Sequence, residues 1–152
     1  MSTALSLNAS EDSIQLLTFT IDKHLFGVHV LNVRDIFVAD KVTPVPLAKP
    51  EIKGLINLRG RIVTSISLRK KLGFPDLGEE LRQMNIAVEH DGEVYSLLVD
   101  KVGDVMNLAQ DTFEKKPQVL DPAVKEYAQG VFKLDNDLLI FLDIHKIVET
   151  CI

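Results

Sequence analysis

The 152-residue chain has the size of one compact domain, and its composition, 46% hydrophobic and 26% charged, is that of a folded globular protein. A formal net charge of -5 disfavours binding to nucleic acid or anionic lipid, and the longest apolar runs, such as Leu138–Leu142, fall far short of the roughly 20 residues that span a bilayer. The single cysteine, Cys151, cannot form an intrachain disulfide, and no secretion signal is recognisable, so we expect a reducing, cytoplasmic environment.

The first half of the chain predicts mostly short strands. Residues 1–12 lack periodicity and predict a mobile tail. Ile14–Ile21 and Leu25–Leu31 alternate in hydrophobicity and predict a hairpin. From Leu31 to Phe37 the apolar spacing changes and favours one or two helical turns. The prolines of Val42–Pro46 predict an edge strand or a fixed connector.

The strand pattern continues to the carboxyl end. Gly54–Leu58 and Arg61–Leu68 predict a hairpin that turns at Arg59-Gly60, and the polar residues 74–83 mark the best internal boundary. The second half then predicts a hairpin of Met84–Glu89 with Glu93–Val99, a strand Val102–Leu108, a loop Gln110–Val124, a hairpin of Tyr127–Leu134 with Leu138–Leu142, and a helix Ile144–Glu149 capped by Asp143. Many short strands with brief helices indicate an all-β barrel or a pair of barrels.

Motifs for catalysis or cofactor binding are weak. The four histidines lack the spacing of a metal site, so we expect no metal: His24, His29, His90 and His145. Scattered glycines form no phosphate-binding loop, and we expect no cofactor. Cys151 lies next to the terminus, where we expect fraying and no nucleophilic role. Three carboxylates follow apolar strands, and we interpret them as strand ends or helix caps rather than a general acid/base pair: Asp100, Asp104 and Asp143.

Basic residues surround the predicted hairpin turn. We interpret Arg69-Lys70-Lys71 as a solvated face, because the run has no aromatic neighbours and the chain is acidic. Arg59 is either an ordinary surface residue of little energetic value or a guanidinium held in place to recognise a carboxylate or backbone carbonyls. The residues alone leave both interpretations open.

Several segments, in order, resemble the CheW family of bacterial chemotaxis coupling proteins. They include LFGVHVLNVRDI, GLINLRGRIVTSISLRKKLG and YSLLVDKVGDVMNL, and the resemblance extends from Ile14 to Glu149. It implies an all-β fold with short helices, built as two small five-stranded SH3-like β-barrels. The implied organisation is a flexible tail over 1–12, one CheW-like domain of two barrel subdomains over 13–149, and a short tail over 150–152.

The resemblance also implies a function. It implies a non-enzymatic adaptor, without cofactor, metal or nucleic acid, in the cytoplasm at membrane-anchored receptor arrays. The implied partners are the regulatory domain of the histidine kinase CheA, the cytoplasmic tips of chemoreceptors, and other CheW-like domains in array rings. The alternatives are an adaptor of a non-flagellar system such as type IV pilus motility, and a small enzyme built on Asp100, Asp104 and Asp143.

The residues that match the family's receptor-binding region are Val33, Asp35, Ile36, Gly54, Asn57 and Arg59. At Asp35 the family usually has Glu. We expect Asp35, on the short helix, to pair with Arg59 beside an apolar groove that receives the helical tip of a receptor. If that pair is partly buried, removing one member costs about 3 to 5 kcal/mol. Thr64 and Ser67 stand where the family commonly has Pro and Asp, so Ser67 supplies no carboxylate there.

Overall fold

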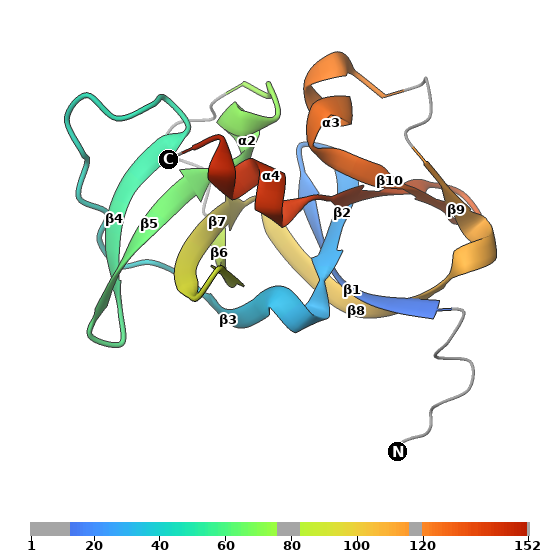
Figure 1. The fold of residues 1–152 in the computed structure, drawn as a ribbon, viewed down its shortest axis with the longest axis horizontal. Coiled ribbons are helices and arrows are strands. Elements are labelled where there is room, and N and C mark those ends of the chain that lie inside the picture. Colours follow the sequence, from blue (N-terminus) through green and yellow to red (C-terminus); the bar gives the residue numbers. More distant parts are fainter. Residues whose placement is uncertain (1–12, 76–82, 116–119, 152) are drawn as a thin grey trace.

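The computed structural model describes residues 13–75, 83–115 and 120–151, so the expected tail over 1–12 and residue 152 lie outside the described residues. The described chain forms two β-sheets, each curled into its own lobe, with short helices between and above them (Figure 1). Within these ranges, none of the helices combines the length and the apolarity that crossing a membrane requires.

One lobe is a six-stranded sheet with the order β8-β1-β2-β11-β10-β9. Its strands are β1 (Ser13–Ile21), β2 (His24–His29), β8 (Lys101–Ala109), β9 (Phe113–Glu114), β10 (Ala128–Lys133) and β11 (Leu138–Leu142). Neighbouring strands are antiparallel, except that β2 and β11 run parallel. The expected lobe of five strands is thus confirmed in outline, and the two-residue β9 adds a sixth.

The other lobe is a five-stranded sheet with the order β3-β6-β7-β5-β4. Its strands are β3 (Val33–Phe37), β4 (Ile52–Leu58), β5 (Arg61–Ser67), β6 (Met84–His90) and β7 (Glu93–Val99). Here β5 and β7 are the parallel pair. The chain therefore leaves the first lobe after β2, builds the second completely, and returns at β8.

The polar segment 74–83 does not separate the lobes, although it was the best internal boundary in the sequence. Its described residues connect helix α2 (Leu68–Lys71) to β6, both parts of the five-stranded lobe, and 76–82 lie outside the described residues. Polar composition marks a surface connection of either kind, whereas lobe membership depends on strand pairing between distant segments. The division into two successive halves is therefore wrong.

The helix expected over Leu31–Phe37 is also wrong. Only Val30–Asn32 form a single 3-10 turn, and Val33–Phe37 form β3, which pairs with β6 through Ile36 and Ile86. Val, Ile and Phe favour strands, and pairing with a preformed neighbour overrides a local spacing that also fits a helix. The loop expected from Gln110 contains a 3-10 turn (Gln110–Thr112), β9 and helix α3 (Pro122–Tyr127), which starts with a proline where its missing N–H costs nothing.

Other expected elements are confirmed. The connector Val42–Pro46 is fixed by a single bridge, in which Thr43 and Leu55 exchange hydrogen bonds of 2.8 and 2.7 Å. Helix α4 (Ile144–Glu149) is capped by Asp143, whose Oδ1 accepts from the Lys146 N–H at 3.1 Å.

The two lobes share one hydrophobic core. Consecutive residues of β1 are buried on both faces: Leu16 belongs to a cluster within the six-stranded sheet, whereas Leu17 and Phe19 belong to a second cluster. That second cluster also contains Ile66 and Ile86 from the five-stranded lobe, together with residues of α3 and α4. Each lobe therefore buries apolar surface against the other, which fixes their relative position.

Candidate partner-binding site

The candidate site lies where the two edges of the five-stranded sheet approach each other. In sheet order β3 is the first strand and β4 the last, yet Asp35 of β3 and Arg59, at the turn after β4, form an ion pair with 3.0 Å between Oδ2 and the guanidinium. Curling of the sheet brings these edges together (Figure 1). The pairing of Asp35 with Arg59 is confirmed, but Asp35 is on a strand rather than a helix.

The turn that carries Arg59 is a two-residue hairpin loop between the paired residues Leu58 and Arg61. Arg59 has φ 53° and Gly60 has φ 86°, and positive values at both central positions are those of a type I′ turn. Asn57 supports the turn, because its Oδ1 accepts from the Gly60 N–H at 2.9 Å. Arginine is unfavourable in this left-handed conformation, which Asn and Gly tolerate. The backbone conformation at Arg59 therefore costs some stability relative to Asn or Gly at the same position.

The ion pair is asymmetric in its exposure to solvent. The side chain of Arg59 is 78% exposed and that of Asp35 only 19% exposed. Asp35 Oδ1 accepts from the Ile36 N–H at 2.8 Å, whereas Oδ2 is buried and makes no hydrogen bond among the described residues, so Arg59 supplies its compensating charge. The expected loss of about 3 to 5 kcal/mol does not apply, since a pair with one fully solvated member contributes about 0.2–1 kcal/mol.

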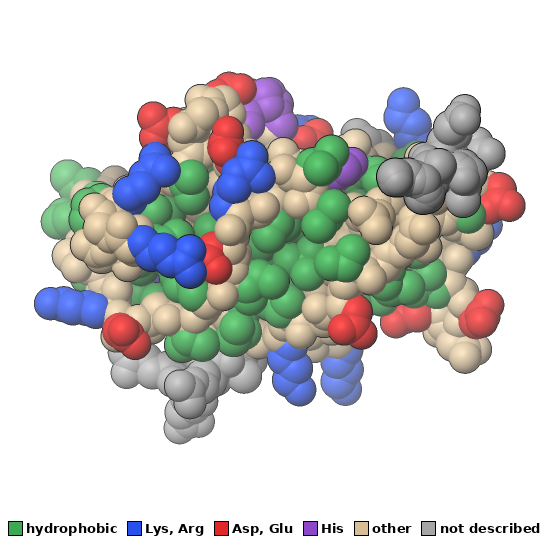
Figure 2. Space-filling model, turned by 90° about the horizontal axis from the view of Figure 1, so that it is seen from below, with side chains coloured by type: hydrophobic (Ala, Val, Ile, Leu, Met, Phe, Trp, Pro, Cys, Tyr) green, Lys and Arg blue, Asp and Glu red, His purple; other side chains and the backbone are tan. Residues whose placement is uncertain are grey.

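A groove opens beside this pair. It has a volume of about 370 Å³ and is lined by residues 35–41 of β3 and the following loop and by Asn57, Leu58 and Arg59. Exposed apolar side chains adjoin it: Ile36 and Val38 along the groove, and Ile62, which pairs with Asn57 on the hairpin. Figure 2 shows hydrophobic side chains gathered across the middle of the face that contains β3, with basic and acidic groups beside them. A partner here would meet exposed apolar side chains with charged side chains next to them.

The structure divides the expected site residues into two groups. Asp35, Ile36, Asn57 and Arg59 line the groove. Val33 does not: it is half-buried and packs against the main core. Gly54 is buried and does not line the groove; it has φ 151°, and a Cβ there would lie 2.4 Å from the Thr43 carbonyl oxygen. Gly54 is thus a structural residue that lets the Thr43 connector bridge to β4.

Sequence reasoning missed part of the groove. Val38, Lys41 and Leu58 line or adjoin it, and Ile62 is exposed next to it. The signal for Val38 was present, because Ile36 and Val38 continue a period of two, as expected on an edge strand. Treating this segment as helical concealed the pattern.

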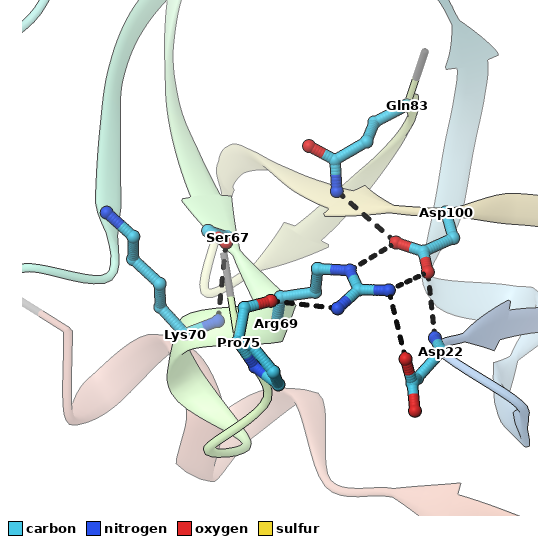
Figure 3. Close-up of polar contacts among 7 residues, drawn as sticks. All are labelled: Asp22, Ser67, Arg69, Lys70, Pro75, Gln83 and Asp100. Carbon is cyan, nitrogen blue, oxygen red and sulfur yellow. Dashed lines mark hydrogen bonds and ion pairs between the residues drawn. The ribbon is translucent and has the colours of Figure 1, made fainter. Parts of the chain in front are cut away.

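A second charged cluster, which the sequence analysis misassigned, joins the two lobes (Figure 3). Arg69 of α2 binds Asp100, between β7 and β8, through two hydrogen bonds of 2.9 and 2.6 Å, and also donates to the Pro75 carbonyl at 2.8 Å. The side chain of Arg69 is only 3% exposed and that of Asp100 only 8% exposed. Asp22, in the β1–β2 turn, donates its N–H to Asp100 at 2.7 Å. Arg69 is therefore a buried structural cation, and its assignment to a solvated face is wrong.

The surroundings of Asp100 favour its charged form. Burial by itself raises the pKa of Asp100, but the hydrogen bonds from Arg69 and the Asp22 N–H outweigh it, and the net pKa lies below the ordinary value. The hydrogen bond to Asp100 raises the pKa of Arg69 against the opposing effect of burial. The cluster is thus fully ionised at neutral pH, and it ties the β1–β2 turn of one lobe to α2 of the other.

Lys71 and Cys151 correct two further expectations. Lys71 is buried, with its Nζ 3.1 Å from Glu51 Oε2 and 4.9 Å from the centre of the Tyr127 ring. Cys151 is buried as well, at 4% exposure, so the chain end is packed rather than frayed at that residue. Burial raises the pKa of the Cys151 thiol, which keeps it protonated and unreactive at neutral pH.

The departure at Ser67 and the three carboxylates have simple structural roles. The Ser67 side chain caps α2 by accepting from the Lys70 N–H, a role for which Ser serves as well as Asp. Asp100 belongs to the cluster with Arg69, Asp143 caps α4, and Asp104 is exposed. Among the described residues these three do not gather into a common site.

These features define a class of protein: a two-lobed all-β domain with an exposed groove, lined by apolar and charged side chains, where the two edges of one sheet meet. The model of the CheW-like domain matches residues 15–151. The chain therefore belongs to the CheW family, whose scaffold proteins are non-enzymatic.

Individual relatives agree with this placement. The chain is 33% identical over 135 residues to the chemotaxis protein CheW of Thermotoga maritima, covering 89% of this chain and 87% of that protein. It is 27% identical over 146 residues to protein PilI of Pseudomonas aeruginosa, covering 91% and 79%. The crystal structure of the scaffolding protein TtCheW from Thermoanaerobacter tengcongensis superposes with a TM-score of 0.78 at 29% identity, covering 90% of this chain and 92% of that one. The fold expected from the resemblance is confirmed.

Proposed function

We propose that this protein is a non-enzymatic scaffold that couples chemoreceptors to the histidine kinase CheA in chemotaxis. The observation that carries the proposal is the Arg59 turn: a strained arginine, paired with Asp35 and exposed beside an apolar groove, in a chain of the CheW family. Residues held in sparsely populated backbone regions cluster at binding and switch sites, which supports a binding role for Arg59.

The groove supports a receptor as its occupant on grounds of shape and chemistry. An amphipathic helix needs an apolar floor for its buried face and polar groups at the rim, and Ile36 and Val38 with Asp35 and Arg59 supply both. Because Arg59 keeps most of its guanidinium donors free of Asp35, it can donate to a carboxylate or to the terminal carbonyls of such a helix. Val33 and Gly54 contribute by holding β3 and β4 in place.

The remaining parts of the proposal concern organisation and partners. Residues 13–149 act as one CheW-like domain of two barrel subdomains, with short tails at 1–12 and 150–152. The second partner is the regulatory domain of CheA, and other CheW-like domains join the same array rings. The site of action is the cytoplasmic side of membrane-anchored receptor arrays, where the receptor tips lie.

An alternative partner set is a chemosensory system that controls type IV pili, favoured by the likeness to PilI. We prefer the chemotaxis partners, because the chain is 33% identical to the Thermotoga CheW and only 27% identical to PilI, over a comparable share of this chain.

Co-purification from cells, read by mass spectrometry, tests the proposal and separates the alternatives. The expected result is recovery of chemoreceptors together with CheA, and loss of the receptors in Arg59→Ala. Lys133→Ala is the matched control, because Lys133 is an exposed cation on β10 of the other lobe. Recovery of a pilus-system kinase selects the alternative. Equal receptor recovery with Arg59→Ala and with the unchanged chain contradicts the assignment of the groove.

A further inference from the structure

We propose that His90 and His145 form a binding site for a divalent transition-metal ion such as Zn²⁺, on the face where α4 crosses the β6–β7 turn. His90 is the last residue of β6, and His145 is the second residue of α4. They are 55 positions apart, so the sequence carried no spacing signal, yet their Nδ1 atoms lie 3.2 Å apart. This site is separate from the groove and does not depend on the proposed function.

The Nε2 atoms face carboxylates, and this determines where the protons are. His145 Nε2 lies 2.9 Å from Glu149 Oε2, and His90 Nε2 lies 3.5 Å from the same oxygen and 3.4 Å from Asp91 Oδ2. An ionised carboxylate can only accept, so the 2.9 Å contact places the hydrogen of His145 on Nε2, and the two carboxylates near His90 Nε2 favour a hydrogen there as well. In the neutral form of each ring, Nδ1 is then a bare lone pair.

Two bare Nδ1 atoms at 3.2 Å repel one another unless a cation lies between them. Zn²⁺ binds imidazole nitrogen at about 2.0–2.1 Å, and two ligands at a tetrahedral angle on such an ion are about 3.3 Å apart. The observed separation of 3.2 Å therefore suits two ligands of one ion. Imidazole is a ligand that Zn²⁺, Cu²⁺ and Ni²⁺ all favour.

The carboxylates act as the outer shell of this site. Metal-bound imidazoles commonly donate their other N–H to a carboxylate, which fixes the ring and makes its bare nitrogen a better ligand. Glu149 lies within this reach of His145, four positions earlier on the same side of α4, and its Oε2 is also 3.5 Å from His90 Nε2. His90 is held further by burial, since its side chain is only 10% exposed. The first ligand is therefore rigid, whereas His145, 60% exposed, is accessible from solvent.

Room for the remaining ligands exists next to the histidines. A polar cavity of about 280 Å³ is lined by both rings together with Asp91 and Asp143, and water from this cavity completes the coordination of the ion. A site with two protein ligands and several waters binds in equilibrium with free metal rather than permanently. Its effect is to clamp α4 onto the β6–β7 turn.

Isothermal titration of the full, tag-free chain with ZnCl₂ tests the site. The expected result is one saturable ion per chain, loss of that binding in His145→Ala, and a weakening of about 10- to 100-fold in Glu149→Gln. His24→Ala is the control, because His24 is an exposed histidine of the other lobe. His145→Ala is preferred to a change at the buried His90, and its metal-free melting temperature shows whether it folds normally.

A second readout concerns the tautomers. Nitrogen chemical shifts of the two imidazoles in the metal-free chain are expected to show Nε2–H on both rings, and Zn²⁺ is expected to shift the Nδ1 signals more than the Nε2 signals. Absence of saturable Zn²⁺ binding, or equal Zn²⁺ affinity in His145→Ala and the unchanged chain, overturns the proposal. A proton shared between the Nδ1 atoms that Zn²⁺ does not displace overturns it too.

Discussion

Replacing Arg69 by alanine tests the buried cluster that joins the lobes. The substitution removes two hydrogen bonds to Asp100 and one to the Pro75 carbonyl, and it leaves the Asp100 carboxylate, 8% exposed, without its cation. Breaking a buried ion pair on one side costs about 3–5 kcal/mol. That is a large part of the roughly 5–15 kcal/mol by which domains of this size are stable. We therefore expect a strongly destabilised protein.

Urea unfolding followed by circular dichroism measures this loss as a shift of the midpoint at constant m-value. Arg34→Ala is the matched control, because Arg34 also pairs with a carboxylate, that of Glu89 at 2.8 Å, but is 45% exposed. We expect the control to cost less than about 1 kcal/mol. A double substitution, Arg69→Met with Asp100→Leu, is expected to recover part of the loss, since no charge is then left unpaired. If Arg69→Ala costs no more than Arg34→Ala, the account of the cluster is wrong.

Three further predictions follow from individual contacts. The pKa of Asp100 is lower in the folded chain than its ordinary value. The stability that the ionised carboxylate contributes is therefore complete above the ordinary pKa and is lost as the pH falls below about 4. Urea midpoints measured against pH should fall in that range, and they should fall more steeply in the unchanged chain than in Arg69→Ala. Cys151 should react with iodoacetamide far more slowly in the folded chain than in urea, and equal rates would contradict its burial. Gly54→Ala should lower the free energy of unfolding by on the order of 2 kcal/mol, because its Cβ would be strained and would contact the Thr43 carbonyl. Gly60→Ala should cost less, because there is open space around its Cβ. Equal losses in the two variants would argue against the contact with Thr43.

Local patterns predicted most strands, because apolar and polar residues alternate along a half-buried strand and a hairpin turn contains characteristic turn-forming residues. The turn at Arg59-Gly60 and the cap at Asp143 followed from the sequence in this way. The route of the chain between the two lobes did not follow from the sequence. The parallel pairings of β2 with β11 and of β5 with β7 join segments far apart in the chain, and no short window of sequence carries that information.

The charged residues show the same limit. Arg69 and Lys71 looked like a solvated run, because their partners Asp100 and Glu51 lie 31 and 20 positions away. His90 and His145 looked isolated for the same reason. Asp35 and Arg59 were paired correctly through the family resemblance rather than from spacing, and the extent of their exposure needed the curled sheet.

Arg59→Asn separates the proposed role of Arg59 in binding a partner from its effect on stability. Asparagine tolerates the positive φ of this turn, and this gain offsets the loss of the weak ion pair with Asp35, so the variant should be about as stable as the unchanged chain in urea. The same variant, in reconstituted complexes with receptor cytoplasmic fragments and CheA, should show weakened receptor binding and reduced kinase activation. Unchanged coupling in Arg59→Asn would contradict the account, whereas stable folding with lost coupling is the result it predicts.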